Sequence, residues 1–231
     1  MPPKPRPHGK RKPRAVAVPK ASTSAGGGRD NKLIAMLALG GAALLAVIGI
    51  GAALAFGGGD DGPDPRAALE AAGCTLSATP ALAGNHSVTT PDGTSKEWNT
   101  TPPTSGPHYQ VPAVWGSFDD VVNQAQLVHN LEHGGIAIQY GTGVPAATVQ
   151  SLKTFVQEKS RGTILAPYPA LGDRIALGAW VTESASEPEK GTAYLAKCPD
   201  FDETAFAAFF DAYQFQGPER FPPDTLLPGR T

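Results

Sequence analysis

Hydrophobic and polar positions divide this chain into three parts. Residues 1–32 show no apolar periodicity, residues 33–56 carry no charged side chain, and the remainder alternates short apolar runs with proline and glycine. As a helix, residues 33–56 would be about 36 Å long, which is enough to cross a hydrocarbon core of about 30 Å. The pattern predicts one transmembrane helix, a flexible linker at 57–65 and a single folded domain at 66–231.

The folded domain contains both hydrophobic periods, which predicts an α+β fold. Helical spacing occurs at 65–72, 119–131, 145–159 and 202–213, and apolar runs typical of strands occur at 136–140, 163–166 and 175–181. Residues 79–114 are rich in proline and glycine and are expected to form loops. We therefore expect a small sheet packed by about three helices, preceded by the transmembrane helix.

The distribution of charge predicts an orientation in the membrane. Residues 1–32 hold nine of the 19 Lys and Arg residues but one of the 21 acidic residues, so the rest of the chain has ten basic and twenty acidic side chains. The basic flank of a membrane helix stays in the cytoplasm. We expect a disordered cytoplasmic tail at 1–32 and a cell-membrane protein whose domain at 66–231 is extracytoplasmic. An acidic exterior argues against nucleic acid as a partner and is compatible with cations.

Two cysteines, Cys74 and Cys198, are the only ones in the chain, and both lie in the part expected to be outside. In an oxidising compartment the default for such a pair is a disulfide, which here would join the two ends of the domain. Two metal-binding thiolates are the alternative, but neither cysteine has a neighbouring ligand at the Cys-x-x-Cys or Cys-x-His spacing of such sites. We predict the disulfide.

The stretch at 126–140, QLVHNLEHGGIAIQY, places two histidines four positions apart. On a helix, His129 and His133 lie on one face, and Gly134 is suited to end that helix in a left-handed conformation. A strand through the same residues would also put both imidazoles on one face, because alternate residues share a face. We favour a helix, a turn and then a strand.

Four motifs together carry a resemblance to a known family. They are PPTSGPHY (102–109), VHNLEHGG (128–135), LAPYP (165–169) and ALGAW (176–180). With these motifs the chain resembles a bacterial, mainly actinobacterial, membrane-anchored domain-of-unknown-function family, number 3105. The resemblance covers nearly the whole outer domain and includes a looser match at His86. It implies a basic N-terminus, one membrane span and an outer domain, and it implies no activity.

The outer domain has four histidines, and their arrangement predicts a metal site. The pair of His129 and His133 shares a face, and the proline-rich loop that ends at His108 is stiff enough to deliver a third imidazole. We expect these three and His86 to bind a divalent metal, with Glu132 either as a ligand or as an acceptor that orients an imidazole. Zinc and Cu(II) are favoured because the outer domain lacks the methionines of a Cu(I) carrier. A metal-free hydrogen-bonded cluster is the alternative.

An enzymatic role is less well supported by the residues. His129, Glu132 and His133 spell H-x-x-E-H, the inverted zinc-peptidase motif, with Glu203 as a candidate third ligand. However, the glycine pair stops the helix at the second histidine, and short motifs match by accident. There is no G-x-S-x-G elbow, glycine-rich phosphate loop or dinucleotide fingerprint in the folded domain. We expect a metal-binding protein first, a metal-free cell-envelope interaction or structural module second, and a metal-dependent hydrolase third.

Overall fold

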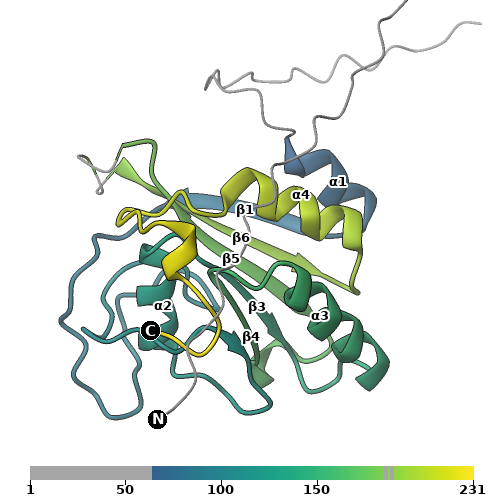
Figure 1. Ribbon diagram of the computed structural model, residues 1–231, viewed down its shortest axis with the longest axis horizontal. Helices are drawn as coiled ribbons and strands as arrows, with labels where there is room; N and C mark the ends of the chain where they lie inside the picture. The colour runs from purple at the N-terminus through teal and green to yellow at the C-terminus, as the bar shows by residue number, and fades with distance from the viewer. Residues whose placement is uncertain (1–63, 185–186, 188–189) are drawn as a thin grey trace, which may run out of the picture. The chain divides into compact units, whose positions relative to one another are not determined.

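The computed structural model describes residues 64–184, 187 and 190–231 (Figure 1). The predicted tail at 1–32, the predicted transmembrane helix at 33–56 and almost all of the predicted linker lie outside these residues. None of the helices within the described ranges has the length and apolar character needed to cross a membrane.

The described residues form a mixed α+β domain, as predicted. Its helices are α1 (Pro65–Ala71), α2 (Gln124–Glu132), α3 (Ala146–Glu158) and α4 (Glu203–Tyr213), with short 3-10 turns η1 (Pro169–Leu171) and η3 (Pro223–Thr225). Its strands are β1 (Thr75–Pro80), β2 (Gly116–Ser117), β3 (Ile136–Tyr140), β4 (Thr163–Pro167), β5 (Ile175–Val181) and β6 (Thr192–Cys198). The sheet is therefore larger than the small one expected, and it is packed by four helices rather than about three.

The six strands form one sheet in the order β1-β6-β5-β3-β4-β2. Strands β1, β6, β5 and β3 pair in antiparallel fashion, whereas β4 is parallel to both β3 and β2. Parallel neighbours need a long crossover connection, and α3 supplies it between β3 and β4. The helix predicted at 145–159 and the strand predicted at 163–166 are thus two parts of one β-α-β unit.

Each face of the sheet has its own hydrophobic core. Successive strand residues point to opposite faces, so Ile136 and Ile138 of β3 pack with α1, α3 and α4, while Ala137 between them packs with α2. Figure 1 shows these three helices together on one side and α2, surrounded by loops, on the other. The α2 face is where the predicted histidines lie.

One predicted helix starts later than expected. The sequence pattern indicated a helix from 119, with the acidic pair near its start, but α2 begins at Gln124. Asn123 is the N-cap, and its side-chain oxygen accepts hydrogen bonds from the backbone N–H groups of Ala125 and Gln126. Asp119 instead pairs with Lys153 of α3 at 2.6 Å. The predicted boundary was wrong because an asparagine cap outcompetes the acidic pair.

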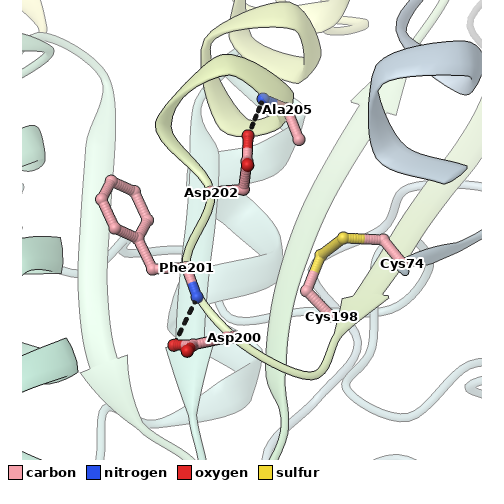
Figure 2. Close-up of a disulfide and its surroundings, with 6 residues drawn as sticks. All are labelled: Cys74, Cys198, Asp200, Phe201, Asp202 and Ala205. Atoms are coloured by element: carbon pink, nitrogen blue, oxygen red, sulfur yellow. Dashed lines mark hydrogen bonds between the residues drawn. A yellow bond between two sulfur atoms is a disulfide. The ribbon is translucent and has the colours of Figure 1, made fainter. Parts of the chain in front are cut away.

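The predicted disulfide between Cys74 and Cys198 is confirmed, with the two sulfur atoms 2.07 Å apart (Figure 2). Cys74 directly precedes β1 and Cys198 ends β6, and these two strands are antiparallel neighbours with Thr75 opposite Lys197. The bond therefore fastens the edge strand of the sheet to its neighbour, and both cysteines belong to the core under α1 and α4.

Candidate metal centre

Helix α2 and its C-cap carry three of the candidate ligands, and the helix is unusually buried. Every residue from Leu127 to Glu132 is buried, because the helix is covered by the sheet on one side and by loops on the others. The helix ends where the sequence indicated: His133 is its C-cap, and Gly134 follows with φ of +85°. The predicted order of helix, turn and strand is confirmed, and it places His129 and His133 on one face.

The loop that carries His108 is buried as well, so it is not an ordinary surface loop. All residues from Pro102 to His108 are buried. The indole N–H of Trp98 donates to the carbonyl oxygen of Pro107 at 2.9 Å, and the backbone N–H of His108 donates to the carbonyl oxygen of Asn85 at 2.9 Å. These bonds join the loop to the segment that contains His86, which lies next to Asn85 in the chain.

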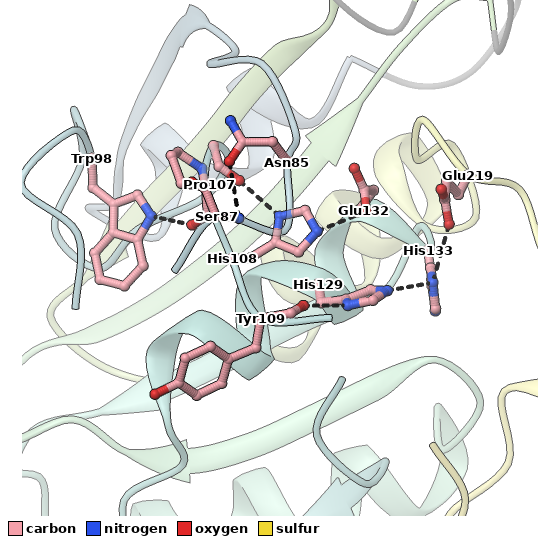
Figure 3. A network of polar contacts seen from close by, with 11 residues as sticks. Asn85, Ser87, Trp98, Pro107, His108, Tyr109, His129, Glu132, His133 and Glu219 are labelled. Atoms are coloured by element: carbon pink, nitrogen blue, oxygen red, sulfur yellow. Dashed lines mark hydrogen bonds and ion pairs between the residues drawn. The ribbon is translucent and has the colours of Figure 1, made fainter. Parts of the chain in front are cut away.

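Two backbone carbonyl oxygens fix the orientation of two imidazoles (Figure 3). His108 Nδ1 lies 2.8 Å from the oxygen of Gly106, and His129 Nδ1 lies 2.7 Å from the oxygen of Tyr109. Because a carbonyl oxygen can only accept a hydrogen bond, both Nδ1 atoms must carry a proton. In the neutral rings, the remaining nitrogen, Nε2, therefore carries the lone pair. Metal-binding histidines are commonly oriented in this way.

Glu132 faces the free nitrogen of His108. Glu132 Oε2 lies 2.9 Å from His108 Nε2, which is the distance of an ion pair when that nitrogen carries a proton; in the neutral ring, with its proton on Nδ1, this fully buried nitrogen has no hydrogen-bond partner. The other carboxylate oxygen is confined by Gly84, where an added Cβ would lie only 2.2 Å from Oε1. A lone pair and a carboxylate that face each other repel unless a proton or a metal ion lies between them.

Four of the five predicted ligands meet in one group. His86, His108, His129 and Glu132 each offer a ligand atom, and these atoms all lie within 4.8 Å of one another. The rings of His86 and His129 are nearly parallel, with centroids 5.0 Å apart, and the ring of His108 lies 4.9 Å from that of His86. His86 is exposed and the other three are buried, so the group reaches solvent through His86.

The fifth predicted ligand, His133, belongs to a different group. Its Nε2 lies 3.0 Å from His129 Nε2 and 3.3 Å from Glu219 Oε2, and these three residues form a second set of candidate ligands. The five residues predicted to form one site are thus divided between two candidate groups that share His129. The division arises because His129 lies between His108 and His133, and one imidazole separates the two.

Sequence reasoning missed Glu219, and the structure places Glu203 away from the histidines. Glu219 lies in a stretch without a recognisable motif, and it reaches His133 only through the path of the chain after α4. Glu203, the candidate third ligand of a peptidase site, begins α4 on the opposite face of the sheet. Asn130, which lies inside the VHNLEHGG motif, was also overlooked: its side chain forms two hydrogen bonds with the backbone of Ala113 and fixes that loop on α2.

Burial sets the protonation of the site. It lowers the pKa of His129 below its ordinary value, and together with the neighbouring His129 it lowers the pKa of His133 to about 4. Burial alone would raise the pKa of Glu132, but the contact with His108 and the other nearby imidazoles outweigh it, so the net pKa is lowered. At neutral pH, His129 and His133 are neutral and Glu132 is ionised, which are the forms that bind metal ions.

Comparison with known proteins identifies the family. A family model described as a protein of unknown function (DUF3105) matches residues 89–224, more than half of the chain. This chain belongs to the DUF3105 family. Neither the curated proteins nor the solved structures that were searched gave a match. The DUF3105 segment contains His108, His129, Glu132, His133 and Glu219, whereas His86 lies just before it.

Proposed function

We propose that this DUF3105 protein binds one divalent metal ion, zinc or copper, through His86, His108, His129 and Glu132. One observation carries the proposal: two buried imidazoles, each oriented by a backbone carbonyl oxygen at Nδ1, have ligand atoms within 4.8 Å of an ionised carboxylate. With His108 neutral and no metal ion bound, His108 Nε2 is a buried polar atom without a hydrogen bond, which costs about 1–3 kcal/mol. A bound ion would remove that cost.

The ligand types and spacing suit a small borderline metal. Zinc takes imidazole nitrogen and carboxylate oxygen at about 2.0–2.2 Å, so tetrahedral ligand atoms lie about 3.3–3.5 Å apart. His108 Nε2 and Glu132 Oε2 are 2.9 Å apart, and the widest separation in the group is at most 4.8 Å. These separations bracket the tetrahedral spacing. Cu(II) accepts the same ligands.

The same geometry favours binding over hydrolysis. In an inverted zinc-peptidase motif, both histidines bind the metal and the glutamate activates water. Here Glu132 groups with His129 as a ligand, and His133 turns instead to Glu219. A water-activating base is thus not available at the position that this motif requires, and we assign no catalytic role to Glu132.

We further propose that residues 33–56 anchor the domain in the cell membrane, with the N-terminal tail in the cytoplasm and the metal site outside. The uncharged run and the basic flank support this arrangement. The disulfide between Cys74 and Cys198 supports it as well, because such bonds persist in oxidising compartments.

A metal titration tests the binding proposal. Zn(II) and Cu(II) are titrated by calorimetry at neutral pH into the full-length, untagged protein in detergent. We expect the wild type to take up one ion per chain and His129→Ala to take up none, because both groups of ligands need His129. His8→Ala is the matched control, since His8 is the one histidine outside the predicted outer domain and its replacement should change nothing.

Circular dichroism and the intact disulfide show whether His129→Ala is folded. If the wild type binds neither metal, or if folded His129→Ala binds as tightly as the wild type, the proposal is wrong. The histidines would then form the metal-free hydrogen-bonded cluster, and the cell-envelope interaction or structural module would be the better assignment.

A further inference from the structure

The group formed by His129, His133 and Glu219 calls for an explanation of its own. Its ligand atoms, like those of the first group, all lie within 4.8 Å of one another. His129 is the one residue that the two groups share. Its Nδ1 is already committed to the carbonyl oxygen of Tyr109, so His129 has a single nitrogen, Nε2, with which to bind a metal. One imidazole nitrogen binds one ion at a time.

Glu219 is held at this group by the backbone. Its N–H donates to the carbonyl oxygen of Glu132, the last residue of α2, at 2.9 Å. Gly217 makes this approach possible, because a Cβ there would lie 2.3 Å from the same carbonyl oxygen. The N–H of Phe215 also donates to the carbonyl oxygen of Gly134 at 2.7 Å. The segment after α4 is therefore fastened along the end of α2, and the position of Glu219 is built into the fold.

The first group is open to solvent at His86, and the second group is open at its carboxylate, Glu219. The side chain of Glu219 is 51% exposed and that of His133 is 11% exposed, while His108 is completely buried and Glu132 is 10% exposed. The ring of Phe221 lies 4.3 Å from the ring of His133 and partly covers it from the solvent side. A cation that arrives from solvent along this side meets Glu219 and His133 before it reaches His108.

Resting on the proposed function, we propose that His129, His133 and Glu219 form an outer metal position, which captures an ion and passes it through His129 to the inner position. The two positions exclude each other because both need His129 Nε2. In the metal-free protein, a hydrogen bond joins His129 Nε2 and His133 Nε2 at 3.0 Å, and with His129 as the acceptor His133 Nε2–H is the donor. An ion at the outer position replaces that proton, which leaves to solvent.

Stoichiometry tests whether the outer position exists and excludes the inner one. Cu(II) is titrated into the full-length protein, and binding is followed by calorimetry and by electron paramagnetic resonance. We expect one ion in the wild type, one in His108→Ala, in which the inner position is broken, and one in Glu219→Gln. The double variant His108→Ala/Glu219→Gln should lose at least about tenfold in affinity relative to His108→Ala.

Glu132→Gln keeps the inference testable if His108→Ala does not fold, because it also weakens the inner position and nearly preserves side-chain volume. Glu70→Gln is the matched control for Glu219→Gln, since Glu70 is an exposed residue of α1 on the other face of the sheet. In the wild-type background, Glu219→Gln should also slow loading of the inner position, measured as quenching of tryptophan fluorescence by Cu(II). The ring of Trp180 lies 6.3 Å from that of His108.

The outcomes separate this inference from the proposed function. If the wild type binds one ion while both inner-site variants bind none, the inner position stands and the outer one is wrong. Two ions in the wild type would also overturn the inference, because His129 could then not be shared. If the wild type binds no ion at all, both proposals fail together.

Discussion

Single atoms at the centre of this domain are placed by the backbone around them. The carbonyl oxygens of Gly106 and Tyr109 accept hydrogen bonds from Nδ1 of His108 and His129. As a result, Nε2 of His108 faces Glu132 and Nε2 of His129 faces His133. A hydrogen bond to a carbonyl oxygen also makes the imidazole a better donor to a metal. The motif residues Gly106 and Pro107 therefore contribute through backbone carbonyl oxygens, which accept hydrogen bonds from His108 and Trp98.

Gly84 offers a direct test of that organisation. A methyl group added here would lie 2.2 Å from Glu132 Oε1 and 2.9 Å from the ring of Trp180. We expect Gly84→Ala to push the carboxylate away from His108 and to weaken Zn(II) binding by about 10–100-fold, as measured by calorimetry. The closest displaced atom is the end of a flexible side chain, and circular dichroism shows whether the variant also accommodates the Trp180 ring and stays folded.

Ser87→Ala serves as the control for Gly84→Ala, since Ser87 lies three residues away in the same loop and its side chain is exposed. Unchanged zinc affinity in a folded Gly84→Ala protein would show that the position of the Glu132 carboxylate does not govern binding.

Acid should destabilise the metal-free protein. The pKa of His133 is lowered to about 4 and that of His129 is lowered as well, whereas a histidine in the unfolded chain has a pKa of about 6.5. Between these values the unfolded state binds more protons, so the free energy of unfolding falls as the pH drops from about 6.5 toward 4. Above pH 6.5 this contribution should be constant. Thermal melts in the presence of a chelator, from pH 7.5 to 5, measure the effect.

His133→Asn removes the group with the larger shift and should flatten the dependence of the melting temperature on pH. A melting temperature of the wild type that stays constant down to pH 5 would contradict the lowered pKa values.

The candidate residues could be predicted in part from the sequence, and the reasons are specific. His129 and His133 were found because four-residue spacing on a helix fixes a shared face. His108 was found because proline stiffens the loop before it. Glu219 could not be found, because its place depends on how the chain returns along the end of α2 after α4. Nothing in the local pattern around Glu219 encodes that path.

Among the elements, α2 holds the most candidate ligands. Strand β1 was among the elements that the sequence did not predict. The strands at 136–140 and 175–181 and the helices at 65–72, 145–159 and 202–213 could be predicted because their apolar positions keep a clear period. Strand β1 has no fully buried residue, since it lies at the edge of the sheet, so its hydrophobic pattern is weak. Strand β6 contains small alanines that blur its alternation. Both strands were missed for these reasons.

The two faces of the sheet differ in what packs on them: one carries the larger hydrophobic core and the other carries the candidate ligands. Helices α1, α3 and α4 pack on the larger core, which includes the disulfide, while α2 and its loops hold the candidate ligands. Strand β5 serves both faces, with Leu177 in the larger core and Trp180 beside His108. A rigid sheet that is stabilised from one side can hold a polar cluster on the other, and loops can then vary around it without loss of the fold.

At the scale of the whole molecule, the predicted membrane orientation determines in which compartment the disulfide and the candidate metal site lie. We expect a cysteine introduced by Asp61→Cys to react with an impermeant thiol reagent added to intact cells, because residues after the predicted span should be outside. The native cysteines are bonded to each other and should not react. A cysteine placed at Ser24 in the tail is the control and should react after lysis alone. Labelling of Asp61→Cys that requires lysis would reverse the orientation.

Pairing between the first and last strands has a consequence for the order of events in biogenesis. Strand β1 cannot pair with β6 until more than a hundred further residues have been synthesised, and Glu219 is synthesised later still. Contacts so distant in the chain form late and slowly. If the domain crosses the membrane as an unfolded chain, the ligands assemble after the crossing, in the outer compartment. The ion that the protein acquires would then be decided by which metals are plentiful there, and the cytoplasm, with its own metal supply, would have no part in the choice.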